Sequence, residues 1–73
     1  MSARLPTVSA KALTQALLRA GFIELRQRGS HRIFALGSRR AIVPMHGGDL
    51  KPGTLKAILD ASGLTPDRLR ELL

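Results

Sequence analysis

The sequence predicts a small α+β domain in which a helix precedes three antiparallel strands and two helices follow them. Apolar residues recur at helical spacing near both ends of the chain, and the middle third alternates between apolar and polar residues. Gly or Pro separates these segments. We therefore expect one domain over residues 1–73, with a three-stranded sheet and helices packed on one of its faces.

The first predicted helix begins after Ser9, whose hydroxyl suits the N-cap position. Val8 and Leu13 take the N′ and N4 positions of a hydrophobic staple around this start. The apolar residues of the segment then fall on one helix face, at Leu13, Ala16, Leu17 and Ala20. Gly21 is expected to end the helix as its C′ residue.

Three strands are predicted next, over residues 22–28, 31–36 and 41–45. Gly29 and Ser30 suit a two-residue type II′ loop, so the first two strands should form a hairpin. Pro44 has no N–H to donate to a ladder, which predicts that the third strand lies at a sheet edge.

The hairpin loop predicts which side chains share a face. A two-residue loop gives three cross-strand pairs, which are Arg28 with His31, Arg26 with Ile33, and Glu24 with Ala35. The other face is apolar and should lie beneath the helices, with Ile23 and Leu25 opposite Leu36 and Phe34. His31 is therefore expected on the open face, beside Arg26 and Arg28.

The second turn leaves two registers open. A four-residue loop over 37–40 sends to the core face Ala41, Val43 and Met45. A three-residue loop sends there Arg40, Ile42 and Pro44. Burying the unpaired charge of Arg40 is costly, which favours the four-residue loop. In that register His46 lies opposite His31, and both histidines occupy one end of the open face.

Residues 46–49 form a loop, and Pro52 suits the first position of a second helix. Gly63 should end this helix, whose apolar face consists of Leu55, Ile58 and Leu59. Thr65 and Pro66 are typical of the N-cap and N1 positions of a short terminal helix, which carries Leu69, Leu72 and Leu73.

The charge of the chain indicates a polyanionic or acidic partner. Twelve Lys and Arg residues outnumber five Asp and Glu residues, which gives a net charge of +7 and a pI near 11.7. The absence of cysteine excludes disulfides and thiolate metal sites. No apolar run is long enough to span a membrane, and the N-terminal residues lack the apolar segment of a secretion signal. We expect a cytoplasmic protein without cofactor or metal.

Two imidazoles, several arginines and the start of the second helix are thus predicted to meet at one end of the sheet. The N-terminus of a helix favours phosphate because its free N–H groups and dipole are positive, here near Lys51, Gly53 and Thr54. Together these features indicate a phosphodiester site. On residue types alone, however, a histidine in a small basic domain is more often a bystander, and arginines often form a solvated face.

The chain resembles the HicA/YcfA-type toxins of bacterial toxin–antitoxin modules in several motifs. These are the start Val8, Ser9 and Lys11, "GF" at 21–22, "RQRGSHRIF" at 26–34 and "VPMHGGDLKPGTLKAIL" at 43–59. The family shows V-P-x-H, a small loop and G-T-L-x-x-I-L in the last of these segments. One departure is Met45, which stands where relatives often carry a basic residue.

The resemblance implies a fold like that of double-stranded-RNA-binding domains (dsRBDs), with the order α-β-β-β-α. It also implies ribonuclease activity on mRNA, with the G-S-H histidine, here His31, as the catalytic residue. A HicB-type antitoxin would neutralise the protein by covering this site.

We hypothesise that His31 acts as a general base, or as the single acid and base, in metal-independent cleavage by the 2′-OH of RNA. His46 is a possible auxiliary catalytic residue, and Gly29 shapes the turn. The residues assigned to RNA and phosphate binding are Arg26, Arg28, Ser30, Arg32, Lys51 and Thr54.

Two other interpretations stay open. A domain of this fold can bind duplex RNA without cutting it, because a fold does not determine a function. A basic protein of this size can also serve only to complex an acidic protein. A DNA-binding helix-turn-helix is disfavoured, since three strands separate the principal helices.

Overall fold

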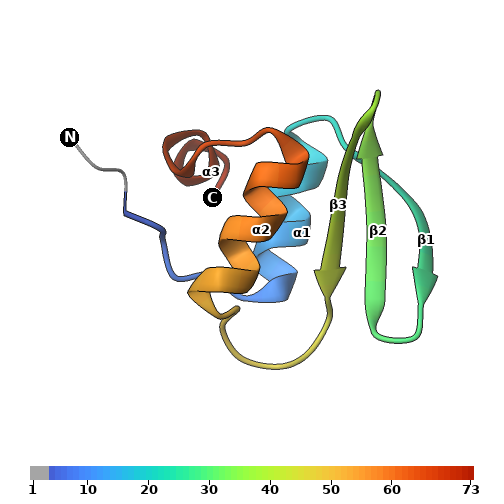
Figure 1. Ribbon diagram of the computed structural model, residues 1–73, viewed down its shortest axis with the longest axis horizontal. Coiled ribbons are helices and arrows are strands. Elements are labelled where there is room, and N and C mark those ends of the chain that lie inside the picture. The colour runs from blue at the N-terminus through green and yellow to red at the C-terminus, as the bar shows by residue number, and fades with distance from the viewer. Residues whose placement is uncertain (1–3) are drawn as a thin grey trace.

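The computed structural model describes residues 4–73, and residues 1–3 of the predicted domain lie outside the described residues. The elements are α1 (Ala10–Arg19), β1 (Ile23–Arg28), β2 (His31–Leu36), β3 (Arg39–Pro44), α2 (Pro52–Ser62) and α3 (Pro66–Leu72). The strands form one antiparallel sheet in the order β1-β2-β3, with the helices on one side of it (Figure 1). The predicted α+β architecture is confirmed, as is the edge position of β3. Within residues 4–73, no helix has the length and apolar character needed to cross a membrane.

The ends of α1 follow from the residues that flank it. The Oγ of Ser9 accepts a hydrogen bond from the N–H of the N3 residue at 3.1 Å, as an N-cap should. Gly21 adopts a φ of 103°, and its N–H donates to the carbonyl of Leu18. The next N–H, that of Phe22, donates to the carbonyl of Leu17 at 3.0 Å. This pair of bonds is a Schellman motif, which turns the chain from α1 into β1.

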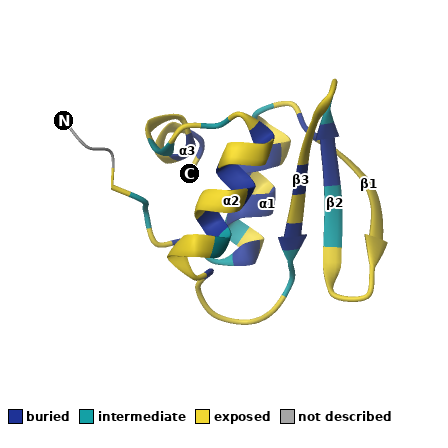
Figure 2. Ribbon diagram, viewed as in Figure 1, coloured by how far each residue is buried: buried dark blue, intermediate teal, exposed yellow. Residues whose placement is uncertain are grey.

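The core lies between the helices and the side of the sheet that faces them. Pro52 begins α2 and Gly63 ends it, while the hydroxyl of Thr65 caps α3 by accepting the N–H of Arg68 at 3.1 Å. Figure 2 shows that the buried residues lie on the helices and on β3 and β2, whereas β1 is exposed. The largest fully buried apolar side chains are Leu13, Leu17, Phe34, Val43, Leu55, Leu59 and Leu69.

Both hairpins close through a two-residue Gly-Ser loop. Gly29 has a φ of 57° and Gly37 a φ of 61°, whereas no residue other than glycine has a positive φ among the described residues. A positive φ at the first loop position followed by a negative one is the pattern of a type II′ turn. The first loop pairs Arg28 with His31, which confirms the predicted hairpin.

The second loop contains only Gly37 and Ser38, so the predicted four-residue loop over 37–40 is wrong. Both loop lengths are even, and Ala41 and Val43 therefore still face the core as predicted. The partner of His31 does change. His31 lies opposite Pro44 rather than opposite His46, because a loop shorter by two residues shifts the pairing by two residues.

A bulge at Leu25 also corrects the predicted register of β1. Glu24 pairs with Phe34 rather than with Ala35, and Ile23 pairs with Ala35. One extra residue in a strand exchanges the faces of the residues beyond it. Ile23 therefore lies on the open face, and Glu24 lies on the side of the helices.

The strand β1 extends beyond the helical layer. All six of its residues are exposed, and Figure 2 shows the whole strand in the colour of exposed residues. Ile23 is 62% exposed and Leu25 is 50% exposed, so the prediction that both pack beneath the helices is wrong. The buried residues of the sheet all belong to β2 and β3, because α1 and α2 cover mainly these two strands.

The left-handed glycine of the second loop provides a test of this account. Space for a methyl group exists at Gly37, since nothing lies within 4 Å of a Cβ placed there. Gly37→Ala should nevertheless lower the free energy of unfolding by about 1–2 kcal/mol, because alanine is strained at positive φ. Unfolding in urea, followed by circular dichroism, measures this change.

The matched control is Gly53→Ala in α2. This glycine has equal space around a Cβ but no positive φ. Alanine there should leave the stability unchanged or raise it by about 0.4–1 kcal/mol, through a less flexible unfolded chain. Equal losses in the two variants would contradict the backbone explanation.

Candidate nucleic-acid interface

His31 is the first residue of β2, and it follows the Gly-Ser loop directly. The residue is exposed and lies between Arg28 on β1 and Pro44 on β3. Residues paired across antiparallel strands share a face, and so do residues two apart in one strand. Arg28 and Arg26 therefore lie on the same open face as His31, as predicted.

Two hydrogen bonds hold the loop that precedes His31. The N–H of Met45 donates to the carbonyl of Ser30 at 2.6 Å, and the side-chain amide of Gln27 donates to the carbonyl of Gly29 at 3.0 Å. The first bond extends the pairing of β2 and β3 by one position past Pro44. It holds the chain just before His46 against the hairpin loop.

His46 therefore lies at the same end of the sheet as His31, although the two residues are not cross-strand partners. His46 is exposed, and its Nδ1 lies 3.3 Å from the carbonyl oxygen of Gly47. A carbonyl oxygen only accepts hydrogen bonds, so Nδ1–H is the donor in the tautomer that forms this bond.

The N-terminus of α2 lies at this end of the molecule as well (Figure 1). Lys51 takes the N-cap position without a side-chain hydrogen bond, and Pro52 has no N–H. The first helical bond joins the N–H of Leu55 to the carbonyl of Lys51 at 2.9 Å. The N–H groups of Gly53 and Thr54 precede this bond, and such groups are suited to an anion.

The loop between β3 and α2 is anchored to the residues before α1. The N–H of Leu50 donates to the carbonyl of Val8 at 2.8 Å, and Ser9 forms an isolated antiparallel bridge with Asp49. These contacts fix the start of α2 relative to the start of α1. The position of Lys51 and Thr54 is thus set by backbone bonds.

Arg32 faces the helical side of the sheet, away from His31. It pairs in register with the buried Val43, and its guanidinium carbon lies 5.4 Å from the centre of the Phe34 ring. Its Nε donates to Glu24 Oε2 at 3.0 Å, and its Nη2 donates to the other carboxylate oxygen. These hydrogen bonds lower the pKa of Glu24 and raise the pKa of Arg32. The structure therefore separates Arg32 from the other predicted phosphate-binding residues.

The remaining positive charge is distributed unevenly. Ion pairs in the described residues use four of the twelve cationic side chains and four of the five acidic ones. Of the eight cations left, half belong to the strands, namely Arg26, Arg28, Arg39 and Arg40. No group of three or more potential metal ligands occurs within residues 4–73.

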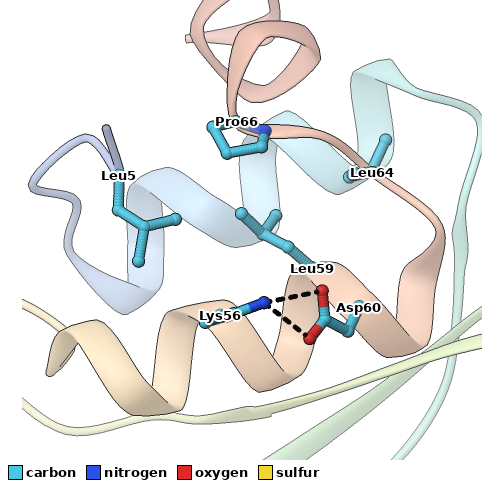
Figure 3. Close-up of a pocket in the computed structure, with 6 residues that line it drawn as sticks. All are labelled: Leu5, Lys56, Leu59, Asp60, Leu64 and Pro66. Carbon is cyan, nitrogen blue, oxygen red and sulfur yellow. Dashed lines mark hydrogen bonds and ion pairs between the residues drawn. The ribbon is translucent and has the colours of Figure 1, made fainter. Parts of the chain in front are cut away.

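A hollow of about 140 Å³ lies elsewhere, between α2, the start of α3 and the segment before α1 (Figure 3). Its one ion pair joins Lys56 to Asp60 at 3.1 Å, and both residues belong to α2. None of the predicted site residues lines this hollow.

Sequence reasoning missed three contributors to the end of the sheet. Pro44 is the true neighbour of His31, while Gln27 and the backbone of Met45 hold the loop. The sequence did contain a signal for the pairing of His31 with Pro44. The second turn repeats the Gly-Ser pair of the first, which indicates a two-residue loop there as well. Nothing in the sequence pattern marks the contact of Gln27.

The fold and this end of the sheet define a small basic α+β protein with exposed arginines and histidines at one end of its sheet. A family model described as "HicA toxin of bacterial toxin-antitoxin" matches residues 10–64, from the start of α1 to just beyond α2. The chain belongs to this family and is a HicA-type toxin of a toxin–antitoxin module. A comparison with curated proteins gave no match. The matched residues include every predicted site residue.

The ion pair of Glu24 predicts a pH-dependent contribution to stability. The pKa of this carboxyl is lower in the folded chain than its ordinary value of 4.5, so the unfolded chain binds the proton more readily. The contribution is complete above pH 4.5 and is lost as the pH falls through the folded pKa. Glu24→Gln should therefore be slightly less stable than the wild type near neutral pH, with the difference vanishing in acid.

Urea unfolding at several pH values measures this difference, which solvent exposure of the pair keeps small. Glu71→Gln is the control, because its ion pair with Arg68 is more exposed, at 52% and 68% against 28% and 32%. A pH-independent loss in Glu24→Gln would show that the carboxylate acts through packing instead.

Proposed function

We propose that this toxin is an endoribonuclease that cleaves mRNA without a metal and so inhibits translation, with His31 as its catalytic residue. We further propose that a HicB-type antitoxin neutralises it. The observation that carries the proposal is the exposed His31 beside Arg28, at the end of the sheet where α2 also begins. This arrangement combines a proton-transfer group with cations that attract a phosphodiester.

RNA supplies its own nucleophile in the proposed reaction. A base removes the proton of the 2′-OH, the O2′ atom attacks phosphorus, and the bond from phosphorus to the 5′-oxygen breaks. The departing 5′-oxygen takes a proton from an acid, which leaves a 2′,3′-cyclic phosphate and a 5′-hydroxyl. Imidazole suits both roles near neutral pH. His31 acts as the base or fills both roles in turn, and His46 is the auxiliary group at the same end of the sheet.

The phosphate groups of RNA meet donors from three parts of the fold in this proposal. Arg26 and Arg28 come from β1, Ser30 comes from the hairpin loop, and Lys51 and Thr54 come from the start of α2. Cations near the reacting phosphate stabilise the charge that develops on its oxygens. Arg32 lies on the other face and its charge is neutralised by Glu24, so it makes no phosphate contact in this proposal.

Recognition of RNA would rest on the backbone more than on the bases. The only two aromatic residues, Phe22 and Phe34, are 2% and 0% exposed, so neither offers a surface for stacking. Binding through phosphate contacts depends strongly on salt and weakly on sequence. We therefore expect a modest sequence preference.

Cleavage by the His31→Ala variant tests the proposed role of His31. Wild-type protein should cut a single-stranded RNA in the presence of EDTA, and His31→Ala should be slower by about 10²–10⁴-fold, the usual contribution of a general acid or base. RNA with 2′-deoxy substitution at the scissile position should remain intact, since it lacks the nucleophile. Gel analysis of end-labelled RNA measures both rates.

His46→Ala is the companion variant. If both histidines transfer protons, His46→Ala should lose one limb of the bell-shaped pH–rate profile of the wild type. If His31 is the only proton-transfer group, His46→Ala should keep the wild-type profile. Wild-type rates in His31→Ala would refute the catalytic role of that residue. Tight RNA binding without any cleavage would favour the non-catalytic RNA-binding module instead.

RNA binding by variants of Arg28 tests the phosphate contacts. In a His31→Ala background, which prevents cleavage, Arg28→Ala should weaken binding and reduce the slope of log K against log salt by about 0.7 for a single strand. Arg70→Ala is the matched control, because Arg70 lies on α3 and pairs with Asp67 at 2.8 Å. Fluorescence anisotropy over a range of salt concentrations measures both. Equal losses would assign the binding to net charge and not to the face of His31.

A further inference from the structure

We propose that β1 is a docking edge, which pairs through its backbone with one strand of an acidic protein partner. Membership of a toxin–antitoxin family supplies the expectation of a protein partner. The inference concerns where and how such a partner binds. It does not depend on the reaction proposed for His31.

The free backbone groups of β1 follow from its register. In a hairpin with a two-residue loop, the residues that flank the loop exchange both hydrogen bonds, and bonded and non-bonded pairs then alternate. Arg28 and His31 form the bonded pair, so Gln27 and Arg32 form the next, non-bonded pair. Gln27 therefore points its N–H and C=O away from β2, toward the free edge.

The same alternation shows that the other edge is protected. On β3 the bonded pair is Arg39 with Leu36, so the outward-facing positions are Arg40, Ile42 and Pro44. Pro44 has no N–H and blocks the end of this edge. The guanidinium of Arg40 folds back onto the carbonyls of Gly37 and Arg39, at 2.8 and 2.9 Å. The strand β3 also packs against α2, whereas β1 is exposed along its whole length.

The apolar side chains of β1 suit a protein better than a nucleic acid. Ile23 is 62% exposed and Leu25 is 50% exposed, although large apolar residues on an edge strand invite aggregation. Leu18, at the end of α1, is 49% exposed just before the turn that leads into β1. The first half of β1, next to α1, thus exposes the apolar Ile23 and Leu25. The second half, which ends at the hairpin loop, carries the basic Arg26 and Arg28.

Charge identifies the kind of occupant. Arg26 and Arg28 form no ion pair with any described residue, so a second copy of the strand would place like charges side by side. The net charge of +7 adds to this repulsion. A strand that carries Glu or Asp in alternation with apolar residues would instead pair with both arginines and cover the apolar half.

Docking of such a strand would also affect RNA binding. Neighbouring strands lie about 4.8 Å apart, so the added strand would lie roughly 10 Å from β2 and need not touch His31. Its carboxylates would neutralise Arg26 and Arg28, which are the phosphate contacts proposed for β1. The partner would thus compete with RNA for Arg26 and Arg28 without contacting the imidazole of His31.

A designed peptide tests the docking edge on the intact protein. The probe is a ten-residue peptide that alternates Glu with Val, and the matched control replaces every Glu by Lys. We expect the acidic peptide to shift the amide resonances of β1 and to slow hydrogen exchange of the Gln27 N–H by at least about tenfold. The basic peptide should do neither.

Two further arms separate backbone pairing from general attraction. Gln27→Pro should weaken binding of the acidic peptide by about tenfold or more, whereas Gln27→Ala, which keeps the N–H, should stay within about twofold. With wild-type protein, N-methylation of the peptide at alternate residues should abolish binding. This arm stands even if Gln27→Pro fails to fold.

Three results would overturn the proposal. Equal binding of the two peptides or undiminished binding of the N-methylated peptide would exclude a specific strand pairing. Protection of β3 amides instead of those of β1 would place the docking site on the other edge. Protection of Gln27 by a 2′-deoxy oligonucleotide but not by the acidic peptide would assign the edge to nucleic acid.

Discussion

The left-handed backbone of Gly29 and Gly37 fixes the register on which the rest of the sheet depends. Each glycine opens a two-residue loop, with φ values of 57° and 61°. Because both loops have an even length, His31 shares its face with Arg28 on one side and Pro44 on the other. A change of one residue in the first loop would exchange the faces of β1 relative to His31. The two turns therefore determine which residues surround this histidine.

The sequence predicted the faces of β2 and β3 better than their pairs. The cost of burying Arg40 excludes odd loops but does not distinguish two residues from four, so Ala41 and Val43 were placed correctly while His46 was misplaced. The bulge at Leu25 has no clear local signal, since apolar and polar residues alternate from Ile23 to Arg26, across the bulge itself. It shifts Glu24 onto the helical side of the sheet, where the carboxylate meets Arg32 above Phe34. That contact is tertiary and lies beyond pattern reasoning.

The uneven cover of the sheet follows from its size. A chain of 73 residues supplies two main helices, and these bury the inner faces of β2 and β3 but not that of β1. Exposed apolar residues on β1 lower the solubility of an isolated strand edge, and charged residues on the edge oppose self-association. Arg26 and Arg28 are the charged residues that oppose self-association at this edge. The same charges that oppose the pairing of identical copies would favour a strand of opposite charge at this edge.

Three of the four ion pairs in the described residues lie within the helices. Carboxylates neutralise cations on α2 and α3, through Lys56 with Asp60 and two pairs within α3. Arg19 is also occupied, because it donates to the carbonyl of Leu72 at 2.6 Å. The strands retain four arginines without an ion pair among the described residues, although Arg40 donates to the carbonyls of Gly37 and Arg39. The N-cap of α2, Lys51, lies at the same end as the hairpin loop. Phosphates of the proposed RNA substrate and carboxylates of the proposed protein partner would therefore be attracted to overlapping cations.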